Sequence, residues 1–278
     1  MMMSETADRG TPDHWQDLEE GRLAALLEIA QQAGAHTLKY FGSQVLQVDA
    51  KSDDSPVTIA DREAESLARE LISARFAADT VQGEEFAEQA GDSRYRWVID
   101  PIDGTKSFIC GVPLYSTLLA IEKDEIPIAG VILIPALGEL VVAADGLGCW
   151  HRSGLGRDWT RARVSEKTKL SEAVFVTSQV DSFADRGAGA GYLGLQEQSW
   201  ITRSWGDGYG YLLVATGRAD LMVDPICNAW DVAAMLPIMR ESGGRFTDWK
   251  GQETVRGGDG LGTNGGIHDA VLDVLGCR

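Results

Sequence analysis

The stretch Trp97-Val-Ile-Asp100-Pro-Ile-Asp103-Gly-Thr105 decides how this chain is interpreted. Its apolar beginning predicts a short buried strand that brings Asp100 to the strand's carboxyl end. Pro101 then bends the backbone, so that Asp103 faces the same point three residues later. Two carboxylates placed in this way repel each other at pH 7 unless a cation neutralises them. The spacing therefore predicts a cation site at the end of the strand.

Gly104 and Thr105 follow these two carboxylates and open a predicted short helix. The free N–H groups of a helix start face an anion. A cation site beside a phosphate cradle is the minimum apparatus for metal-assisted cleavage of a phosphoester. The alternative interpretation is an acidic turn that its own Asp side chains cap, with no ligand.

Other acidic positions are candidates to complete the site. Gly83-Glu84-Glu85 forms a polar loop before the strand, and Asp61 lies in the first turn of a helix that begins at Thr58 as a capping box. Asp231, after Trp230, stands at the start of a later helix. When Asp61 and Asp231 are each considered alone, helix capping explains the residue as well as metal binding does.

Apolar periodicity predicts alternating helices and strands along the chain. The predicted helices cover residues 17–41, 58–76, 209–216 and 230–242, the last stopped by Gly243-Gly244. The predicted strands cover residues 97–100, 117–122, 129–134, 139–144, 173–180 and 221–223. This order indicates a layered α/β or α+β architecture. We expect a disordered tail over residues 1–12, an N-terminal half over 13–150 with most metal ligands, and a C-terminal half over 151–278 with Asp231 and the substrate-specificity residues.

The composition is that of a soluble globular enzyme. The chain has 278 residues, 44% of them apolar, and a formal net charge of −17. Such an acidic chain repels phosphate backbones, so we expect no binding to nucleic acid. Glycines and prolines interrupt the apolar stretch 126–144, which indicates short strands instead of a membrane span. The polar start lacks a secretion signal, and the four scattered cysteines indicate reduced thiols, so we expect a cytoplasmic protein.

Motifs of other enzyme classes are missing. The sequence has no Cys-x₅-Arg thiolate cradle, no Gly-x-Ser-x-Gly elbow and no Gly-x₄-Gly-Lys-[Ser/Thr] loop, and its four histidines are dispersed. Gly189-Ala-Gly191-Tyr-Leu-Gly194 matches the dinucleotide pattern in letters alone, because the residues before it, 181–186, do not resemble a strand. We interpret this segment as a flexible glycine loop.

Asp100-Pro-Ile-Asp-Gly-Thr105 together with Trp230-Asp231-Val-Ala-Ala resembles the paired signature of the inositol monophosphatase family. Gly83-Glu84-Glu85 and Thr58-Ile-Ala-Asp61 resemble its other metal-site elements, in the family's order and spacing, and the likeness extends from about residue 17 to the C-terminus. The resemblance implies an α/β/α/β/α sandwich, a homodimer and dependence on Mg²⁺.

The same resemblance implies roles for single residues. It places Glu84, Asp100 and the Ile102 carbonyl on one Mg²⁺, and Asp100, Asp103 and Asp231 on a second, with a third, looser ion near Glu84. Catalytic roles fall to Glu84 and Thr105, which orient the attacking water, and to Asp61, which helps to hold the cluster. The amides of Gly104 and Thr105 bind the phosphate, and Lys51 occupies a position that the family uses near it.

The segment 203–220 and the glycine-rich run 257–265 resemble the histidinol-phosphate phosphatase branch of this family. We therefore expect Asp224 to pair with the substrate's ammonium, in a pocket that Asp207, Tyr209 and Asn228 also line. A cation beside a cationic substrate is unhelpful, so we expect Arg218 to brace Asp207 or Asp224 or to reach across a dimer interface.

The competing hypotheses differ in the activity that each predicts for the protein. Within the class, the alternative is an inositol-1-phosphate or broad-specificity sugar phosphatase. An acidic metal-binding or regulatory protein would keep the fold without catalysis, yet Asp61, Glu84, Asp100, Asp103, Thr105 and Asp231 are all present. The hypothesis that the protein is an oxidoreductase rests on the 189–194 segment alone.

Overall fold

The computed structural model describes residues 11–43, 48–50, 56–154 and 158–276. Seven strands form the larger sheet, in the order β3-β4-β5-β6-β7-β8-β9. Their bounds are β3 Thr80–Gly83, β4 Tyr95–Asp103, β5 Ser116–Lys123, β6 Ile126–Ile134, β7 Glu139–Ala144, β8 Gly148–Ser153 and β9 Thr160–Arg161. β3 and β4 are parallel, and each later neighbour in this sheet is antiparallel.

A smaller sheet has five strands in the order β11-β10-β12-β14-β13. Their bounds are β10 Val174–Val176, β11 Ile201–Arg203, β12 Leu221–Asp224, β13 Arg245–Thr247 and β14 Gly260–Thr263. A separate antiparallel pair joins β1 Val48–Ala50 to β2 Pro56–Thr58.

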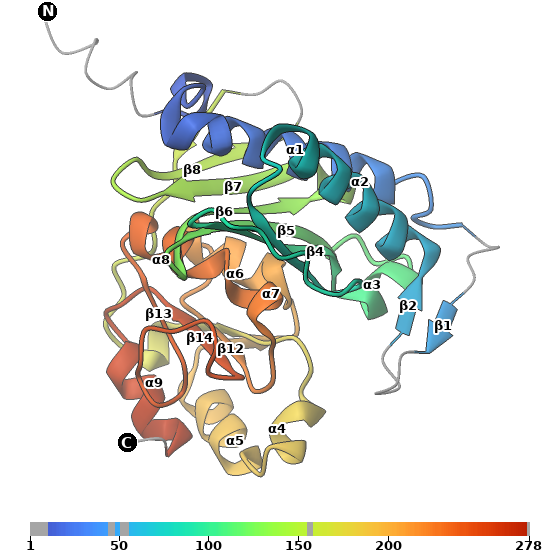
Figure 1. Ribbon diagram of the computed structural model, residues 1–278. Helices are drawn as coiled ribbons and strands as arrows, with labels where there is room; N and C mark the ends of the chain where they lie inside the picture. Colours follow the sequence, from blue (N-terminus) through green and yellow to red (C-terminus); the bar gives the residue numbers. More distant parts are fainter. Residues whose placement is uncertain (1–10, 44–47, 51–55, 155–157, 277–278) are drawn as a thin grey trace, which may run out of the picture.

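The helices lie above, between and below the two larger sheets (Figure 1). Their bounds are α1 Arg22–Thr37, α2 Ile59–Arg75, α3 Thr105–Ile109, α4 Asp181–Asp185, α5 Gly189–Gln198, α6 Gly208–Ala215, α7 Ala229–Val232, α8 Met235–Ser242 and α9 His268–Leu275. Short 3₁₀ turns cover Pro12–His14, Leu18–Gly21, Pro135–Leu137 and Leu170–Glu172. α1 and α2 cover one face of the large sheet, α6 and α8 lie between the sheets, and α5 and α9 cover the far face of the small sheet. The predicted α/β/α/β/α sandwich is confirmed.

Burial of the large sheet on both faces explains why its central strands β5, β6 and β7 are largely apolar. Along β4, Val98 packs toward the layer of α6 and α8, whereas Trp97 and Ile99 pack with α1 and α2. Successive side chains of a strand point to opposite faces, so both faces require apolar residues. β4 is thereby fixed from both sides, and it carries Asp100 and Asp103.

Two predicted helices are shorter than expected. The helix predicted over 17–41 begins only at Arg22, because Glu19, Glu20 and Gly21 adopt left-handed backbone conformations. The helix predicted over 230–242 is divided into α7 and α8. Pro237 explains the break, since it has no N–H for the carbonyl of Ala233 and its ring crowds that carbonyl. Gly243 ends α8 in the left-handed conformation, as predicted.

Two other predictions for the C-terminal part of the chain are corrected. The strand predicted over 173–180 covers only Val174–Val176, and at Ser178 the side chain bonds to Asp224. The segment 189–194 is not a flexible loop: it is the first part of α5, and a helix, α4, precedes it. Gly191 and Gly194 let α5 approach α9 closely, because a Cβ at either position would press on Leu275 or Val274. The missing strand removes the dinucleotide interpretation.

The predicted halves 13–150 and 151–278 remain a proposal. The boundary at residue 150 falls within β8, and the large sheet continues through β9 to Arg161.

Candidate active site

Asp100 and Asp103 lie at the end of β4, where the pairing with β5 is irregular. The register shifts between the two residues, which indicates a bulge that re-aims the side chains. The Ile102 amide donates to Asp100 Oδ1 at 3.0 Å, and the Thr117 hydroxyl donates to the Pro101 carbonyl at 2.8 Å. Gly104 then turns the chain into α3 with a φ of 86°. The predicted strand, bend and short helix are confirmed.

Asp231 joins this pair from α7, which packs beside β4. Its Oδ2 accepts from the Asn228 amide at 2.6 Å, so it also takes part in the capping box of α7. One carboxylate oxygen from each of Asp100, Asp103 and Asp231 lies within 4.8 Å of the other two. The sequence reasoning left capping and metal binding open for Asp231, and the geometry is compatible with both.

Asp61 lies on α2 and connects this cluster to Thr105. Its Oδ2 accepts from the amide and hydroxyl of Thr58, at 2.8 and 2.6 Å, and these bonds form the predicted capping box. The Thr105 hydroxyl lies 3.5 Å from Asp61 Oδ1 and 3.2 Å from the Ile102 carbonyl. The hydroxyl proton is therefore directed toward Asp61 or Ile102, which leaves the lone pairs of Thr105 to accept a hydrogen bond from a water.

Glu84 follows β3, and its charge acts on the same cluster. It raises the pKa values of Asp61, Asp100 and Asp231. The sequence reasoning missed the residue that organises this turn, Glu65, which is fully buried on α2. Glu65 Oε2 accepts from the Glu85 amide at 2.7 Å, and Gly83 packs directly against the Glu65 carboxylate. Its position four residues after Asp61, on the same face of the helix, is the signal that was available.

Electrostatics favour a cation at the cluster. Burial, followed by repulsion from Glu84, Asp103 and Asp231, raises the pKa of Asp100 well above its usual value. Burial and the charge of Asp207 raise the pKa of Asp103 in the same way, and burial raises the pKa of Asp231 to about 7. A cation reverses these shifts, and a donor set made only of oxygens suits Mg²⁺. The residues present therefore fit the metal that the resemblance implies.

A small cavity of about 50 Å³ opens beside Asp103 and Asp231. Two of the predicted substrate residues, Asp207 and Asp224, line it. The other lining residues are Asp103, Ser178, Gly208, Tyr211, Ile226, Cys227 and Asp231. Sequence reasoning missed Ser178, which comes from a separate segment, and also Tyr211, Ile226 and Cys227, which lie near predicted residues in the chain. Only Tyr211 carried a signal, being one helical turn after Asp207.

The remaining predicted substrate residues lie elsewhere. Tyr209 packs against the core between the sheets, and Asn228 is the exposed N-cap of α7, so neither lines this cavity. Arg218 does not brace Asp207 or Asp224: its guanidinium donates to Glu139 at 2.7 Å and to Thr216 at 2.9 Å. Arg218 is separated from Asp207 and Asp224 because the chain turns at Gly217 after α6 and places Arg218 beside Glu139 of β7. Lys51 lies outside the described residues.

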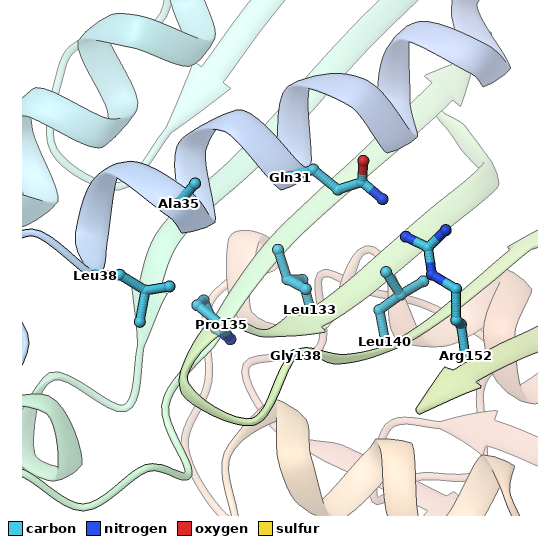
Figure 2. Close-up of a pocket in the computed structure, with 8 residues that line it drawn as sticks. All are labelled: Gln31, Ala35, Leu38, Leu133, Pro135, Gly138, Leu140 and Arg152. Carbon is cyan, nitrogen blue, oxygen red and sulfur yellow. The ribbon is translucent and has the colours of Figure 1, made fainter. Parts of the chain in front are cut away.

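A larger cavity of about 220 Å³ shares no residue with the acidic cluster. Figure 2 shows it below α1, where Gln31 and Ala35 lie above Leu133 and Leu140. Its walls are mainly apolar, and Arg152 is the charged residue among the described residues that line it. The candidate active site is therefore identified by the chemistry of its side chains and not by the volume of its cavity.

Fold and site together define a layered α/β protein with a centre of carboxylates at the end of β4 and the start of α7, of which Asp100 is buried and Asp103 and Asp231 are half-buried. A family model described as the inositol monophosphatase family matches residues 18–275. The chain belongs to the inositol monophosphatase family, and it is a phosphatase of that family.

Named relatives agree with this assignment. A protein of Chlorobaculum parvum named histidinol-phosphatase is 44% identical over 86% of this chain and 90% of its own length. A Streptomyces coelicolor protein of the same name is 39% identical over 96% of this chain and 99% of its own. Among solved structures, an inositol monophosphatase (IMPase) of Thermotoga maritima superimposes with a TM-score of 0.81 at 31% identity, covering 92% of this chain and 96% of that one.

A membrane-spanning helix would need a long, continuously apolar stretch. None of the helices in the described residues has one.

Proposed function

We propose that this protein is a Mg²⁺-dependent phosphatase that hydrolyses L-histidinol phosphate to L-histidinol and phosphate, a step of histidine biosynthesis. The convergence of Asp100, Asp103 and Asp231 beside a cavity lined by two further carboxylates carries the proposal. The names of the two relatives above support the choice of substrate.

Two to three Mg²⁺ ions are proposed to bind at the acidic cluster. The resemblance to the family assigns Glu84, Asp100 and the Ile102 carbonyl to one ion and Asp100, Asp103 and Asp231 to another, with a third ion near Glu84. When bound, such ions lower the pKa of a water and stabilise the negative charge of the leaving alkoxide.

The chain's own residues position the attacking water and the phosphate. Thr105 directs its hydroxyl proton toward Asp61 or the Ile102 carbonyl, so its lone pairs accept a hydrogen bond from the water. Glu84 is proposed to accept a hydrogen bond from the other hydrogen of that water and to take this proton as the water attacks. The amides of Gly104 and Thr105 are proposed to hold the phosphate oxygens. The water oxygen bonds to phosphorus as the bond from phosphorus to the ester oxygen breaks, and the ester oxygen leaves as an alkoxide that takes a proton from solvent water.

Asp224 is proposed to pair with the substrate's ammonium, with Asp207 close by. Burial raises the pKa of Asp224 to about 7. An ammonium lowers that pKa again and keeps the carboxylate charged. This requirement for a positive partner favours histidinol phosphate over inositol phosphate, which carries no cation.

A panel of substrates tests this assignment. Phosphate release is measured from L-histidinol phosphate, inositol-1-phosphate and fructose-1,6-bisphosphate, with Mg²⁺ and with a chelator. We expect the highest kcat/KM for histidinol phosphate and no activity with the chelator. The likeness to the Thermotoga enzyme supports inositol-1-phosphate as the second candidate. A tenfold preference for it, about 1.4 kcal/mol in transition-state free energy, would overturn the substrate assignment.

We also propose a cytoplasmic homodimer. The family resemblance supports the dimer, and the three cysteines of the described residues, Cys110, Cys149 and Cys227, are free thiols, as is usual in a reducing compartment. Analytical ultracentrifugation of the purified chain tests the dimer.

A further inference from the structure

The floor of the larger cavity, the one between α1 and the large sheet, follows from strand register. Leu133 on β6 lies opposite Leu140 on β7, and Leu140 lies opposite Arg152 on β8. Directly opposed residues of neighbouring strands point to the same face of a sheet. A row of three side chains therefore faces the layer of α1, and the two leucines in it are buried.

The helix above this row covers only part of it. α1 packs on β4, β5 and β6, and at Gly34 it approaches so closely that a Cβ would be 2.5 Å from Leu133 Cδ2. Over β7 and β8 the helix contributes Gln31 and Ala35 to the cavity wall. The short side chain of Ala35 does not fill the space, and a cavity of about 220 Å³ results.

The cavity is polar at one end and apolar at the other. Figure 2 shows the Gln31 amide and the Arg152 guanidinium toward one end, and Leu38 and Pro135 toward the other. None of the described residues that line it carries a carboxylate. Its chemistry therefore matches a molecule with an apolar body and a negatively charged head.

Arg152 supplies the charge complementarity. It is half-buried, and it makes no ion pair with any described residue, although the whole chain has 42 acidic residues. Its guanidinium lies over the Trp159 ring, with Cζ 4.6 Å from the ring centroid. Stacking uses the flat face of a guanidinium, whereas its N–H donors lie in the plane and match the two oxygens of a carboxylate. These donors are free to bind a ligand.

The volume sets the size of the apolar body. A cavity of about 150 Å³ holds one benzene molecule, so 220 Å³ holds a body of about six to eight carbon atoms. A second protein surface is a poorer occupant, because a stable interface needs about 800 Å² from each partner and this site is a hollow with a buried floor.

We propose that this cavity binds a small monocarboxylate whose apolar body has about six to eight carbon atoms. Arg152 and Gln31 hold the carboxylate, and Leu133, Leu140 and Pro135 contact the apolar body. The site is separate from the acidic cluster, and the proposal does not depend on the substrate of the phosphatase.

NMR of the leucine methyl groups locates the ligand. The full-length protein, with ¹³C-labelled leucine methyls, is titrated with hexanoate while Mg²⁺ and inorganic phosphate are present to fill the proposed catalytic site. We expect saturable shifts of the Leu133 and Leu140 methyls. If neither shifts, or if the shifts are confined to Leu118, which lies beside Gly208 at the catalytic cavity, the proposal is refuted.

Two analogues separate the contributions of the head and the body. Hexan-1-ol keeps the body and lacks the charge, whereas butanoate keeps the carboxylate and lacks two methylene groups. We expect Kd to be at least about tenfold higher than for hexanoate in both cases, since the first loses a charged hydrogen bond and the second loses apolar contact. Binding of either analogue within threefold of hexanoate would refute the proposed ligand class.

Arg152→Gln tests the guanidinium. We expect Kd for hexanoate to rise about tenfold, to the value for hexan-1-ol, and Kd for hexan-1-ol to stay the same. The matched control is Arg203→Gln, because the Arg203 guanidinium also lies near a tryptophan ring, 5.9 Å from the centroid of Trp205, and does not line this cavity. If Arg152→Gln binds hexanoate as the control does, Arg152 does not hold the carboxylate.

Ala35→Phe tests the cavity itself. Ala35 is exposed, so the larger side chain fills the hollow from the solvent side of α1 without entering the core. We expect Kd for hexanoate to rise tenfold or more while the methyl spectrum of the remaining core leucines is retained. Unchanged binding would refute the site, and a changed oligomeric state in analytical ultracentrifugation would show that a second copy of the chain covers this cavity instead.

Discussion

At the scale of single residues, Asp100 is the centre of the site. It is 1% exposed, it is repelled by Glu84, Asp103, Asp231 and Asp61, and its Oδ1 accepts from the Ile102 amide. We expect Asp100→Asn to abolish phosphate release at every Mg²⁺ concentration, because the carboxylate that is proposed to bind two ions is lost. In the presence of a chelator the variant should unfold at the same temperature as the wild type or higher, because one repelling charge is gone.

Both measurements on Asp100→Asn are needed. Phosphate release across a Mg²⁺ titration reports the site, and thermal unfolding in chelator reports the fold. Near-normal turnover would mean that the chemistry takes place elsewhere in the protein.

Glu65 is a single residue whose role near the site was not predicted from the sequence. Its two oxygens accept from the Glu85 amide and from Arg69 Nε, both at 2.7 Å. In Glu65→Gln one oxygen becomes an NH₂ group, so one of these bonds is lost and the turn that carries Glu84 shifts. We expect kcat to fall about tenfold or more, as for other buried charged hydrogen bonds, and the Mg²⁺ requirement to rise.

The control for Glu65→Gln is Glu28→Gln. Glu28 also pairs with an arginine, Arg75, but both side chains are exposed. Surface pairs contribute about 0–1 kcal/mol, so kcat and the Mg²⁺ requirement should be unchanged. If both variants lose activity equally, Glu65 does not position Glu84.

At the scale of elements, a buried ion pair connects α1 to the start of β3. Arg22 Nε and Nη2 donate to the two oxygens of Asp79 at 2.8 Å each, and Trp97 Nε1 on β4 donates to Asp79 at 2.9 Å. Both charged side chains are almost fully buried. Removing one partner leaves the other charge unpaired, so we expect Asp79→Asn to lower the free energy of unfolding by about 3–5 kcal/mol.

The pH dependence of this pair has a definite sign. Burial tends to raise the pKa of Asp79, but hydrogen bonds from Arg22, Ser93 and Trp97 outweigh it and lower the pKa. The pair therefore stabilises the fold above the unfolded-state pKa of about 3.9, and this stabilisation is lost as the pH falls below it.

Urea unfolding at pH 7, 5, 4 and 3 tests this behaviour. The wild type should lose more stability than Asp79→Asn on acidification. Asp124→Asn, which removes an exposed ion pair with Arg94, should change stability little at each pH. Parallel pH profiles of wild type and Asp79→Asn would contradict the prediction.

The elements that sequence predicted well are those that local patterns determine. The strand at 97–100 and the turn to Thr105 follow from contiguous residues, and β7 has the predicted bounds. The break at Pro237 and the left-handed Glu19 and Glu20 depend on backbone conformations that apolar periodicity does not report. The cavity beside Asp103 and Asp231 is assembled from side chains of four separate segments, so the contribution of Ser178 could be found only in three dimensions.

At the scale of the whole molecule, acidic residues determine how the stability of the fold changes when a metal ion binds. The chain has a net charge of −17, and buried and half-buried carboxylates converge from α2, β4 and α7 and from the loop after β3. Without a cation this convergence opposes folding, because like charges are buried together. A cation bound only by the folded state reverses the effect.

We therefore expect Mg²⁺ to raise the unfolding temperature. At 100 times the dissociation constant, binding adds about 2.7 kcal/mol for one site, and 1 kcal/mol shifts the midpoint of a domain of this size by about 2–4 °C. A rise of about 5 °C or more is expected relative to chelator, and a smaller one in Asp100→Asn. NaCl at equal ionic strength is the control, because screening of surface charge acts equally in both salts. An equal rise in NaCl, or the same Mg²⁺ response in Asp100→Asn, would show that the stabilisation does not come from the acidic cluster.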